Sequence, residues 1–401
     1  MLNAVNNLLS NKNIKTIILF ILGIMAAVSV YKGCVNAVAF SQDFQWDAAK
    51  ALSMGINPYD ESLAPTDALN EGSLGDFYSH FEGIGAPQRM EANQFPSLLM
   101  LLMPYTLMQP DAARLAWMIS NLIFTALIIW LLKMTFLKDL NNFMFASMAL
   151  LMLAGTPFRN QLGVGQHTLF AFAFFLLAVY CSEKKGPIWC VATIVSLFIS
   201  YFKYTLTAPL VLYFVYKKKY KEIIISIAAH GAFTVMYALI LGNSVMDMIL
   251  KPLKVASVLS SEGGLDLGAL LGGGLPSYIA ALVVAILLFV CTLRAPSGCA
   301  NMIFAVSLLW SLILTYHRTY DFFVLIAAST LFAASDEMPA LSERDNRMLS
   351  GLFLLTVLMV FFVLRIFSEN TASKLLVGAV YYIFTIMVTV FLIRMRDEQR
   401  A

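Results

Sequence analysis

The sequence predicts an all-α, polytopic integral membrane protein with about twelve transmembrane helices. Its 401 residues are 60% hydrophobic and only 13% charged, whereas soluble domains are about 45–50% apolar and about 25% charged. The mean hydropathy is +0.77. The apolar residues form long continuous runs, and not the alternating strands of about ten residues that build an outer-membrane barrel. This composition excludes a soluble enzyme, a disordered chain and a nucleic-acid-binding protein.

A transmembrane helix needs about 20 apolar residues. The first apolar run is followed by Ala37-Val38-Ala39, which resembles a signal-peptidase site. We interpret the run as a first transmembrane span that is retained in the protein. The alternative is a cleaved signal peptide. With the first span retained, both termini are cytoplasmic. The predicted spans are residues 14–33, 111–132, 143–157, 167–182, 188–202, 204–216, 223–242, 275–293, 300–316, 321–334, 349–366 and 375–394.

The distribution of charge agrees with this topology. Cytoplasmic loops of membrane proteins are enriched in Lys and Arg. The twelve-span arrangement places 16 of the 27 basic residues, but only 9 of the 24 acidic residues, on the cytoplasmic side. The basic tract 217–221 is the strongest single indication of which side is cytoplasmic. The charge pattern therefore favours this orientation over one shifted by a single span.

One large loop, residues 34–110, follows the first span on the outer side of the single membrane domain (1–401). It carries nine acidic residues against Lys50 and Arg89. Loops of this length inside a compact protein are usually functional or disordered, and this loop is too aromatic for disorder. Its apolar segment 95–108 is short and contains Pro104, so we predict a re-entrant or surface helix there.

The loop is predicted to open with a helix over residues 41–54. Ser41 is a favourable N-cap, and Gly55 is a natural C-cap. Asp43 and Asp47 lie four residues apart and would share one helix face. Two close carboxylates raise one pKa, which suits a general base. The alternatives are a solvated acidic face and, for Asp47, an ion pair with Lys50.

The other outer connections are short and polar, and charged residues at membrane depth are usually functional. Lys203 lies between two apolar runs with no acid nearby in the sequence, so we expect it to bind an anion. The alternative is a lysine that reaches to the interface. We nominate four residues for a phosphate group: Lys203, Arg159, His317 and Arg318. An ordinary loop residue is the alternative for Arg159, and a hydrogen-bonded structural histidine is the alternative for His317.

Four features together resemble the C-type membrane glycosyltransferases, and most closely glycosyltransferase family 87. An acid follows the first span, ahead of a Gly-x-Asn-Pro-Tyr turn (Asp43, then 55–59). An aromatic-Pro step precedes an apolar helix (Phe95-Pro96). Gly-Gln and a polar residue open a span (165–167). A lysine interrupts an apolar hairpin before a basic tract (Lys203).

The resemblance covers residues 15–225 and, beyond them, His317-Arg318. The sequence departs from the family pattern at Ser97, where the family commonly has a second Pro, and at His167, where the family commonly has Asn. The resemblance implies an inverting transfer of a hexose, with mannose favoured, from a polyprenyl-phosphate carrier to a hydroxyl of a glycan or glycolipid acceptor. It places the catalytic acid at Asp43, with Asp47 second.

The same resemblance assigns the remaining site residues. Gln166 and His167 could bind sugar hydroxyls or cap their helix. Asn57 and Tyr59 belong to the Gly-x-Asn-Pro-Tyr turn and are assigned to substrate binding. The chain has no Asp-x-Asp motif. Nothing in the sequence therefore suggests a clamp for a nucleotide and a metal, and we expect no metal and no cofactor. We also expect a lipid-linked donor, a membrane lipid environment and no nucleic-acid partner.

Three other functions compete with this interpretation. A multi-pass transporter or flippase of a lipid-linked sugar would show inverted repeats and polar residues at mid-membrane, and the sequence shows neither. A polysaccharide ligase or polymerase, by family resemblance, carries its long loop late in the chain. A non-catalytic assembly scaffold is the third. We predict a bacterial plasma membrane enzyme with an extracytoplasmic active site.

Overall fold

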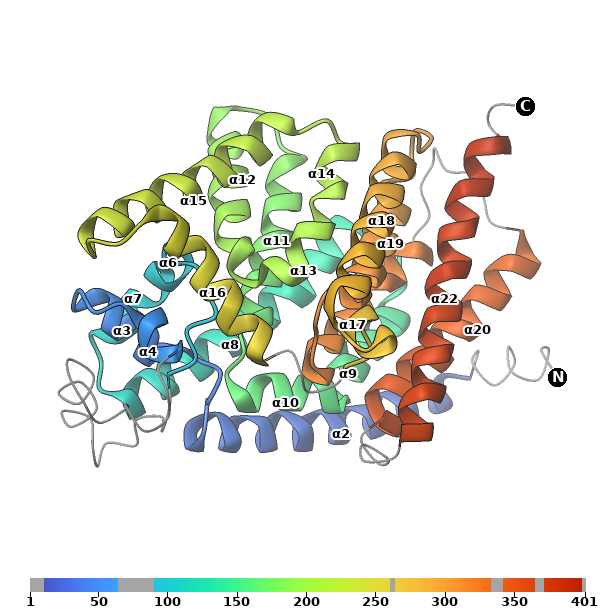
Figure 1. Ribbon diagram of the computed structural model, residues 1–401. Coiled ribbons are helices and arrows are strands. Elements are labelled where there is room, and N and C mark those ends of the chain that lie inside the picture. The colour runs from blue at the N-terminus through green and yellow to red at the C-terminus, as the bar shows by residue number, and fades with distance from the viewer. Residues whose placement is uncertain (1–10, 64–89, 260–263, 333–341, 365–370, 399–401) are drawn as a thin grey trace.

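The computed structural model describes residues 11–63, 90–259, 264–332, 342–364 and 371–398 (Figure 1). Its first half contains α2 (Lys12–Ala39), α3 (Trp46–Ser53), α4 (Pro58–Leu63), α6 (Pro96–Leu99), η2 (Met100–Leu102), α7 (Met103–Thr106), α8 (Pro110–Thr135), α9 (Asn142–Ala154), α10 (Thr156–Val164), α11 (Thr168–Ser182), α12 (Pro187–Ser200) and η3 (Tyr201–Lys203). Its second half contains α13 (Tyr204–Leu210), α14 (Leu212–Tyr216), α15 (Tyr220–Ile240), α16 (Val245–Leu259), α17 (Leu267–Leu271), α18 (Gly274–Leu293), α19 (Ala300–Leu314), η4 (Thr319–Phe332), α20 (Glu343–Leu358), η5 (Met359–Val363) and α22 (Thr371–Glu398). The all-α class is confirmed for these residues.

Many of these helices are suited to a membrane. By length and composition, seven described helices could each cross one: Lys12–Ala39, Pro110–Thr135, Pro187–Leu210, Tyr220–Ile240, Gly274–Leu293, Glu343–Val363 and Ser373–Met395. An eighth is obtained if α10 and α11, which meet at 106°, form one broken span. Shorter apolar helices include α9, α19 and η4. The total of twelve spans stays a prediction.

Pro187–Leu210 qualifies as a span by length and composition alone, but the chain from α12 to α14 turns back on itself at η3. The Thr207 hydroxyl donates to the Ser200 carbonyl oxygen at 3.1 Å, a contact across seven residues that a straight helix cannot make. At the far ends, the Lys217 ammonium lies 3.0 Å from the Glu183 carboxylate. The segment is therefore an apolar hairpin, as the sequence predicts, with Lys203 at its tip.

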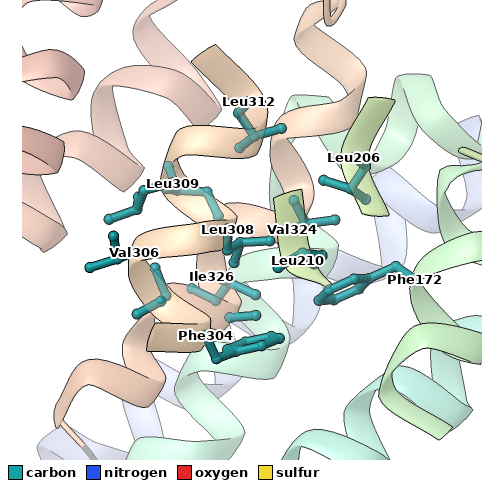
Figure 2. Close-up of a cluster of buried hydrophobic side chains, with 14 of the residues drawn as sticks. Phe172, Leu206, Leu210, Phe304, Val306, Leu308, Leu309, Leu312, Val324 and Ile326 are labelled. Carbon is teal, nitrogen blue, oxygen red and sulfur yellow. The ribbon is translucent and has the colours of Figure 1, made fainter. Parts of the chain in front are cut away.

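A second hairpin, α19 followed by η4, forms the centre of the core. Helices that are apolar on all sides belong in an interior, and nearly every side chain of these two is buried. Figure 2 shows the resulting cluster, in which residues of α19 and η4 meet Phe172 of α11 and residues of α13. The two hairpins thus pack against each other, and both end in polar turns.

Close packing of α2 against α10 fixes the start of the outer loop. In Figure 1 the two helices lie side by side. A Cβ on Gly33 would lie 3.0 Å from Leu162, and a Cβ on Gly163 would lie 3.0 Å from Asn36. Small residues allow helix backbones to approach this closely. The end of α2 is therefore held beside the turn that joins α10 to α11.

The predicted helix over 41–54 begins later than the sequence indicated. Helix α3 starts at Trp46, and the Ser41 hydroxyl donates to the Ala37 carbonyl oxygen at 2.5 Å, so Ser41 does not cap α3. The backbone is left-handed at Ser41 (φ +36°) and Gln45 (φ +57°), which breaks the helix that composition favours. The C-terminal prediction is confirmed, since Gly55 follows α3 with φ +77°.

The apolar segment 95–108 forms the short pieces α6, η2 and α7, which pack against α3 and α15. None of the three is long enough to cross a membrane, which agrees with the prediction that this segment does not span. Its placement at the membrane surface stays a prediction. Residues 64–89 of the predicted loop lie outside the described residues.

We predict that Gly165→Ala destabilises the protein. Gly165 has φ +69°, and an added Cβ would lie 2.9 Å from the Ser41 hydroxyl. Left-handed strain costs an alanine about 1–3 kcal/mol. Thermal unfolding of the purified protein should show a lower melting temperature. The matched control is Gly231→Ala, where an added Cβ meets no atom within 4 Å; equal melting temperatures for both variants would contradict the prediction.

Candidate active site

Four polar turns of the chain converge on one open pocket. They are the turn between α2 and α3, the bend between α10 and α11, the tip of the α12–α14 hairpin, and the turn between α19 and η4. The segment 91–94 closes the remaining side. The pocket is lined by Gln42, Asp43, Gln45, Asp47, Glu91, Asn93, Gln94, Gln166, Lys203, Tyr204, Thr205, Ala256, Tyr316, Arg318, Tyr320 and Asp321.

Asp43 is presented by a tightly held turn. Its backbone N–H donates to the Val164 carbonyl oxygen at 2.9 Å. The next residue, Phe44, is buried, and its carbonyl oxygen lies 2.9 Å from His167 Nε2. Phe44 also stacks on Trp117, with ring centroids 4.9 Å apart. Because its own backbone N–H and the residue that follows it are fixed, Asp43 has little freedom to leave the pocket.

The Asp43 carboxylate accepts two side-chain hydrogen bonds on Oδ2. The Tyr320 hydroxyl donates at 2.9 Å and Gln166 Nε2 at 3.4 Å. Gln166 Nε2 also donates to the Tyr320 hydroxyl at 3.0 Å. Burial raises the pKa of Asp43, while the Tyr320 hydrogen bond and the charges of Arg318 and Lys203 oppose that rise. The result is a desolvated carboxylate with a raised pKa, as a general base requires.

Lys203 forms a buried ion pair with Asp321. The Lys203 ammonium lies 3.3 Å from Asp321 Oδ2, and the two side chains are 13% and 1% exposed. His317 Nδ1 lies 2.9 Å from the same oxygen, and the Thr168 hydroxyl donates to Asp321 Oδ1. No acid lies near Lys203 in the sequence, and a turn far along the chain supplies the carboxylate that it contacts.

Arg318 adds a second cation on the same side of the pocket. Its Nε donates to the Tyr316 hydroxyl at 2.7 Å. Arg318 and Lys203 both act on the charge of Asp43. Lys203 and Arg318 thus face two carboxylates, Asp321 and Asp43, and a phosphate group bound here would share the two cations with them.

Asp47 lies in the first turn of α3 and is 6% exposed. Burial raises the pKa of Asp47 to about 6, with backbone N–H groups of Ala48 and Asp47 lowering it and the Glu91 charge raising it. Lys50 donates to the Thr106 carbonyl oxygen at 3.2 Å, so it is directed away from an ion pair with Asp47. Asp43 and Asp47 line the same pocket, although Asp43 precedes the helix whose face they were predicted to share.

Residues 96–317 match the family model of glycosyltransferase family 87. The match spans more than half of the chain. The chain belongs to glycosyltransferase family 87. The comparison with curated proteins found no match, and neither did the comparison with solved structures.

Family membership makes this chain a multi-pass membrane glycosyltransferase and confirms the resemblance found in the sequence. It selects glycosyltransfer over the transporter, ligase and scaffold alternatives. The matched range includes Gln166, Lys203 and His317 but begins after Asp43. The family match therefore says nothing about Asp43, whose role has to be argued from geometry.

The other predicted phosphate ligands of this family 87 member lie outside the pocket. His317 is fully buried behind Asp321. Arg159 lines two neighbouring pockets, one with Thr319 and Lys374 and the other with Lys32. The structure thus separates the four nominated residues, leaving Lys203 and Arg318 beside Asp43.

The predicted sugar-binding residues are divided in the same way. Gln166 lines the pocket, whereas His167 is fully buried, with Nδ1 3.1 Å from Gln166 Oε1. Asn57 Oδ1 accepts the Tyr59 N–H at 3.0 Å, and the buried Tyr59 hydroxyl donates to the Gln94 carbonyl oxygen at 2.7 Å. His167, Asn57 and Tyr59 therefore support the pocket wall.

The sequence did not single out Tyr320, Asp321 or Gln94. The first two belong to the polar stretch 317–321 that interrupts apolar residues, and an acid at that depth was the available signal. Nothing in the sequence marked Gln94. Its position depends on hydrogen bonds with Tyr59, which is distant in the sequence, and with its neighbour Asn93.

We predict that Asp321→Asn strongly destabilises this enzyme. It leaves the Lys203 charge buried without its partner, and breaking a buried pair costs about 3–5 kcal/mol. Thermal unfolding of purified Asp321→Asn should show a lower melting temperature than wild type. The double variant Asp321→Asn/Lys203→Met should regain part of the loss, since neither charge is then buried alone. A double variant less stable than Asp321→Asn would contradict this account.

Proposed function

We propose that this family 87 enzyme transfers a hexose, with mannose the favoured candidate, from a polyprenyl-phosphate carrier to an acceptor hydroxyl with inversion at the anomeric carbon. The observation that carries the proposal is the joint presence in one open pocket of the Asp43 carboxylate and the cations Lys203 and Arg318. A general base and a phosphate-binding site are the two parts that such a transfer needs from the protein.

In the proposed reaction, Asp43 accepts the proton of the acceptor hydroxyl as its oxygen attacks the anomeric carbon of the donor. The bond from that carbon to the phosphate oxygen breaks, and the carrier leaves as polyprenyl phosphate. Lys203 and Arg318 stabilise the charge that develops on the leaving phosphate. Attack from the face opposite the leaving group inverts the anomeric configuration.

The hydrogen bonds around Asp43 support this role. The carboxylate accepts from Tyr320 and Gln166 on Oδ2, whereas no side-chain donor among the described residues is bonded to Oδ1. Oδ2 is thereby held in place, and Oδ1 can receive the proton. Preorganised groups of this kind contribute most to catalysis because they need no rearrangement during the reaction.

We place the reaction on the extracytoplasmic face of a bacterial plasma membrane, with both termini cytoplasmic. The support is the charge distribution of the loops, in which the basic tract 217–221 lies at the hairpin ends opposite Lys203. Nucleotide sugars are absent outside the cytoplasm, so an activated sugar there has to be carried by a lipid. The acceptor is accordingly a glycan or glycolipid that reaches the same face.

We predict that Asp43→Asn lowers kcat by about 10²–10⁴-fold, because a positioned base contributes a factor of that size. The measurement is mannose transfer from a short-chain polyprenyl-phosphate mannose by the purified enzyme in nanodiscs. The control is Asp111→Asn, which removes a carboxylate that is 72% exposed at the start of α8. Near-normal transfer by a folded Asp43→Asn protein would reject the assignment.

We also predict the pH dependence of the reaction. Asp43 acts when ionised, so kcat/KM should fall as the pH falls through its raised pKa. Tyr320 donates to the carboxylate and lowers its pKa, so Tyr320→Phe should move the acidic limb of the profile to higher pH. The control is Tyr278→Phe, at a tyrosine that is 65% exposed. An acidic limb that moves to lower pH in Tyr320→Phe would contradict the model of a Tyr320-stabilised base.

A further inference from the structure

One group of residues that lines the pocket has a different chemistry from the two cations. It consists of three carboxamides, Gln45, Asn93 and Gln94, together with the carboxylate of Asp47; we call these four residues the carboxamide wall. Asp43, which lies two residues before Gln45 and accepts from Tyr320, lines the same pocket.

The carboxamide wall is internally bonded in a way that leaves acceptor atoms unused. Gln45 Nε2 and Gln94 Nε2 both donate to Asn93 Oδ1, the second at 3.2 Å. Gln45 Oε1 and Gln94 Oε1 are buried and have no hydrogen-bond partner among the described residues. Gln94 itself is only 7% exposed. A buried acceptor without a partner costs free energy unless a ligand supplies the donor.

The backbone is shaped to hold these acceptors at the pocket. Gln45 adopts φ +57°, a left-handed conformation that costs a non-glycine residue free energy and tends to occur at functional sites. Gln94 is fixed through its carbonyl oxygen, which accepts from the buried Tyr59 hydroxyl at 2.7 Å. Asp47 is held in the first turn of α3. These supports position the wall without using the side-chain oxygens of Gln45 and Gln94.

We propose that the carboxamide wall is the subsite for the acceptor sugar, and that it selects an uncharged, hydroxyl-rich ring over a phosphorylated one. Sugar hydroxyls can donate to the unused oxygens of Gln45 and Gln94 and to the Asp47 carboxylate. A phosphate group offers few donors, and Asp47 and Glu91 repel it. The inference rests on the proposed function, because it assigns the cations Lys203 and Arg318 to the donor phosphate.

The two groups of residues bring both reactants into one pocket. A donor phosphate on Lys203 and Arg318 and an acceptor ring on the carboxamide wall place the acceptor hydroxyl in the pocket that Asp43 also lines. The wall therefore acts in acceptor binding.

The test compares wild type with Gln94→Ala and Gln94→Glu in nanodiscs, with short-chain polyprenyl-phosphate mannose as donor and hexyl α-mannoside as acceptor. Loss of one buried hydrogen bond should raise the acceptor KM by about tenfold in Gln94→Ala, while the donor KM stays within about twofold of wild type. Gln94→Glu keeps the shape of the side chain and an acceptor oxygen but loses the Nε2 donor that holds it on Asn93 Oδ1; it provides a second variant if Gln94→Ala fails to fold, and its displaced oxygen should likewise raise the acceptor KM. The control is Gln109→Ala, at an exposed glutamine before α8, which should leave both constants unchanged.

A second arm measures binding without turnover. Saturation-transfer NMR on the Asp43→Asn protein compares hexyl α-mannoside with its 6-phosphate, and the uncharged glycoside should bind more tightly. An unchanged acceptor KM in both Gln94 variants, a raised donor KM, or tighter binding of the 6-phosphate would overturn the subsite. If wild type transfers no mannose but Gln94→Ala weakens glycoside binding, the proposed donor reaction fails and the subsite stands.

Discussion

The buried ion pair between Lys203 and Asp321 is the constraint on which the active site depends. Each residue lies at the polar turn of an apolar hairpin, and each charge would be costly alone in that environment. Their contact at 3.3 Å, with His317 and Thr168 completing the shell of Asp321, joins the two turns. The same turn carries Arg318 and Tyr320 to the pocket. One electrostatic requirement of folding therefore also assembles the cationic side of the site.

A separate set of contacts places the carboxylate. Glycines 33 and 163 let α2 and α10 approach closely, so the chain leaves α2 next to the bend before α11. The backbone then passes through two left-handed residues, Ser41 and Gln45, on either side of Asp43. Rigid helices on both sides maintain that strained turn. A carboxylate held this way is preorganised for the role proposed for Asp43, and packing of the flanking helices stabilises the strained turn.

The lining of the pocket combines two kinds of chemistry. Lys203 and Arg318 offer positive charge, whereas Gln45, Gln94 and Asp47 offer hydrogen-bond acceptors. Membership in glycosyltransferase family 87 gives the class of reaction. In the function proposed above, the cations receive the donor phosphate and the acceptors receive the neutral sugar, so the two substrates are recognised by different interactions.

Composition and hydropathy alone determined the all-helical membrane class, because burial of apolar surface acts on any sequence. The isolated Lys203 between apolar runs marked the tip of a hairpin, because a buried charge is costly wherever it occurs. The order of the motifs along the sequence, with an acid between the first span and the Gly-x-Asn-Pro-Tyr turn, also nominated Asp43 as a candidate site residue. The tertiary structure decided which polar residues meet. It paired Lys203 with Asp321, placed Arg159 and His317 outside the pocket and began α3 at Trp46. These outcomes depend on contacts between segments more than a hundred residues apart and on left-handed backbone at ordinary residues, and no local propensity encodes either.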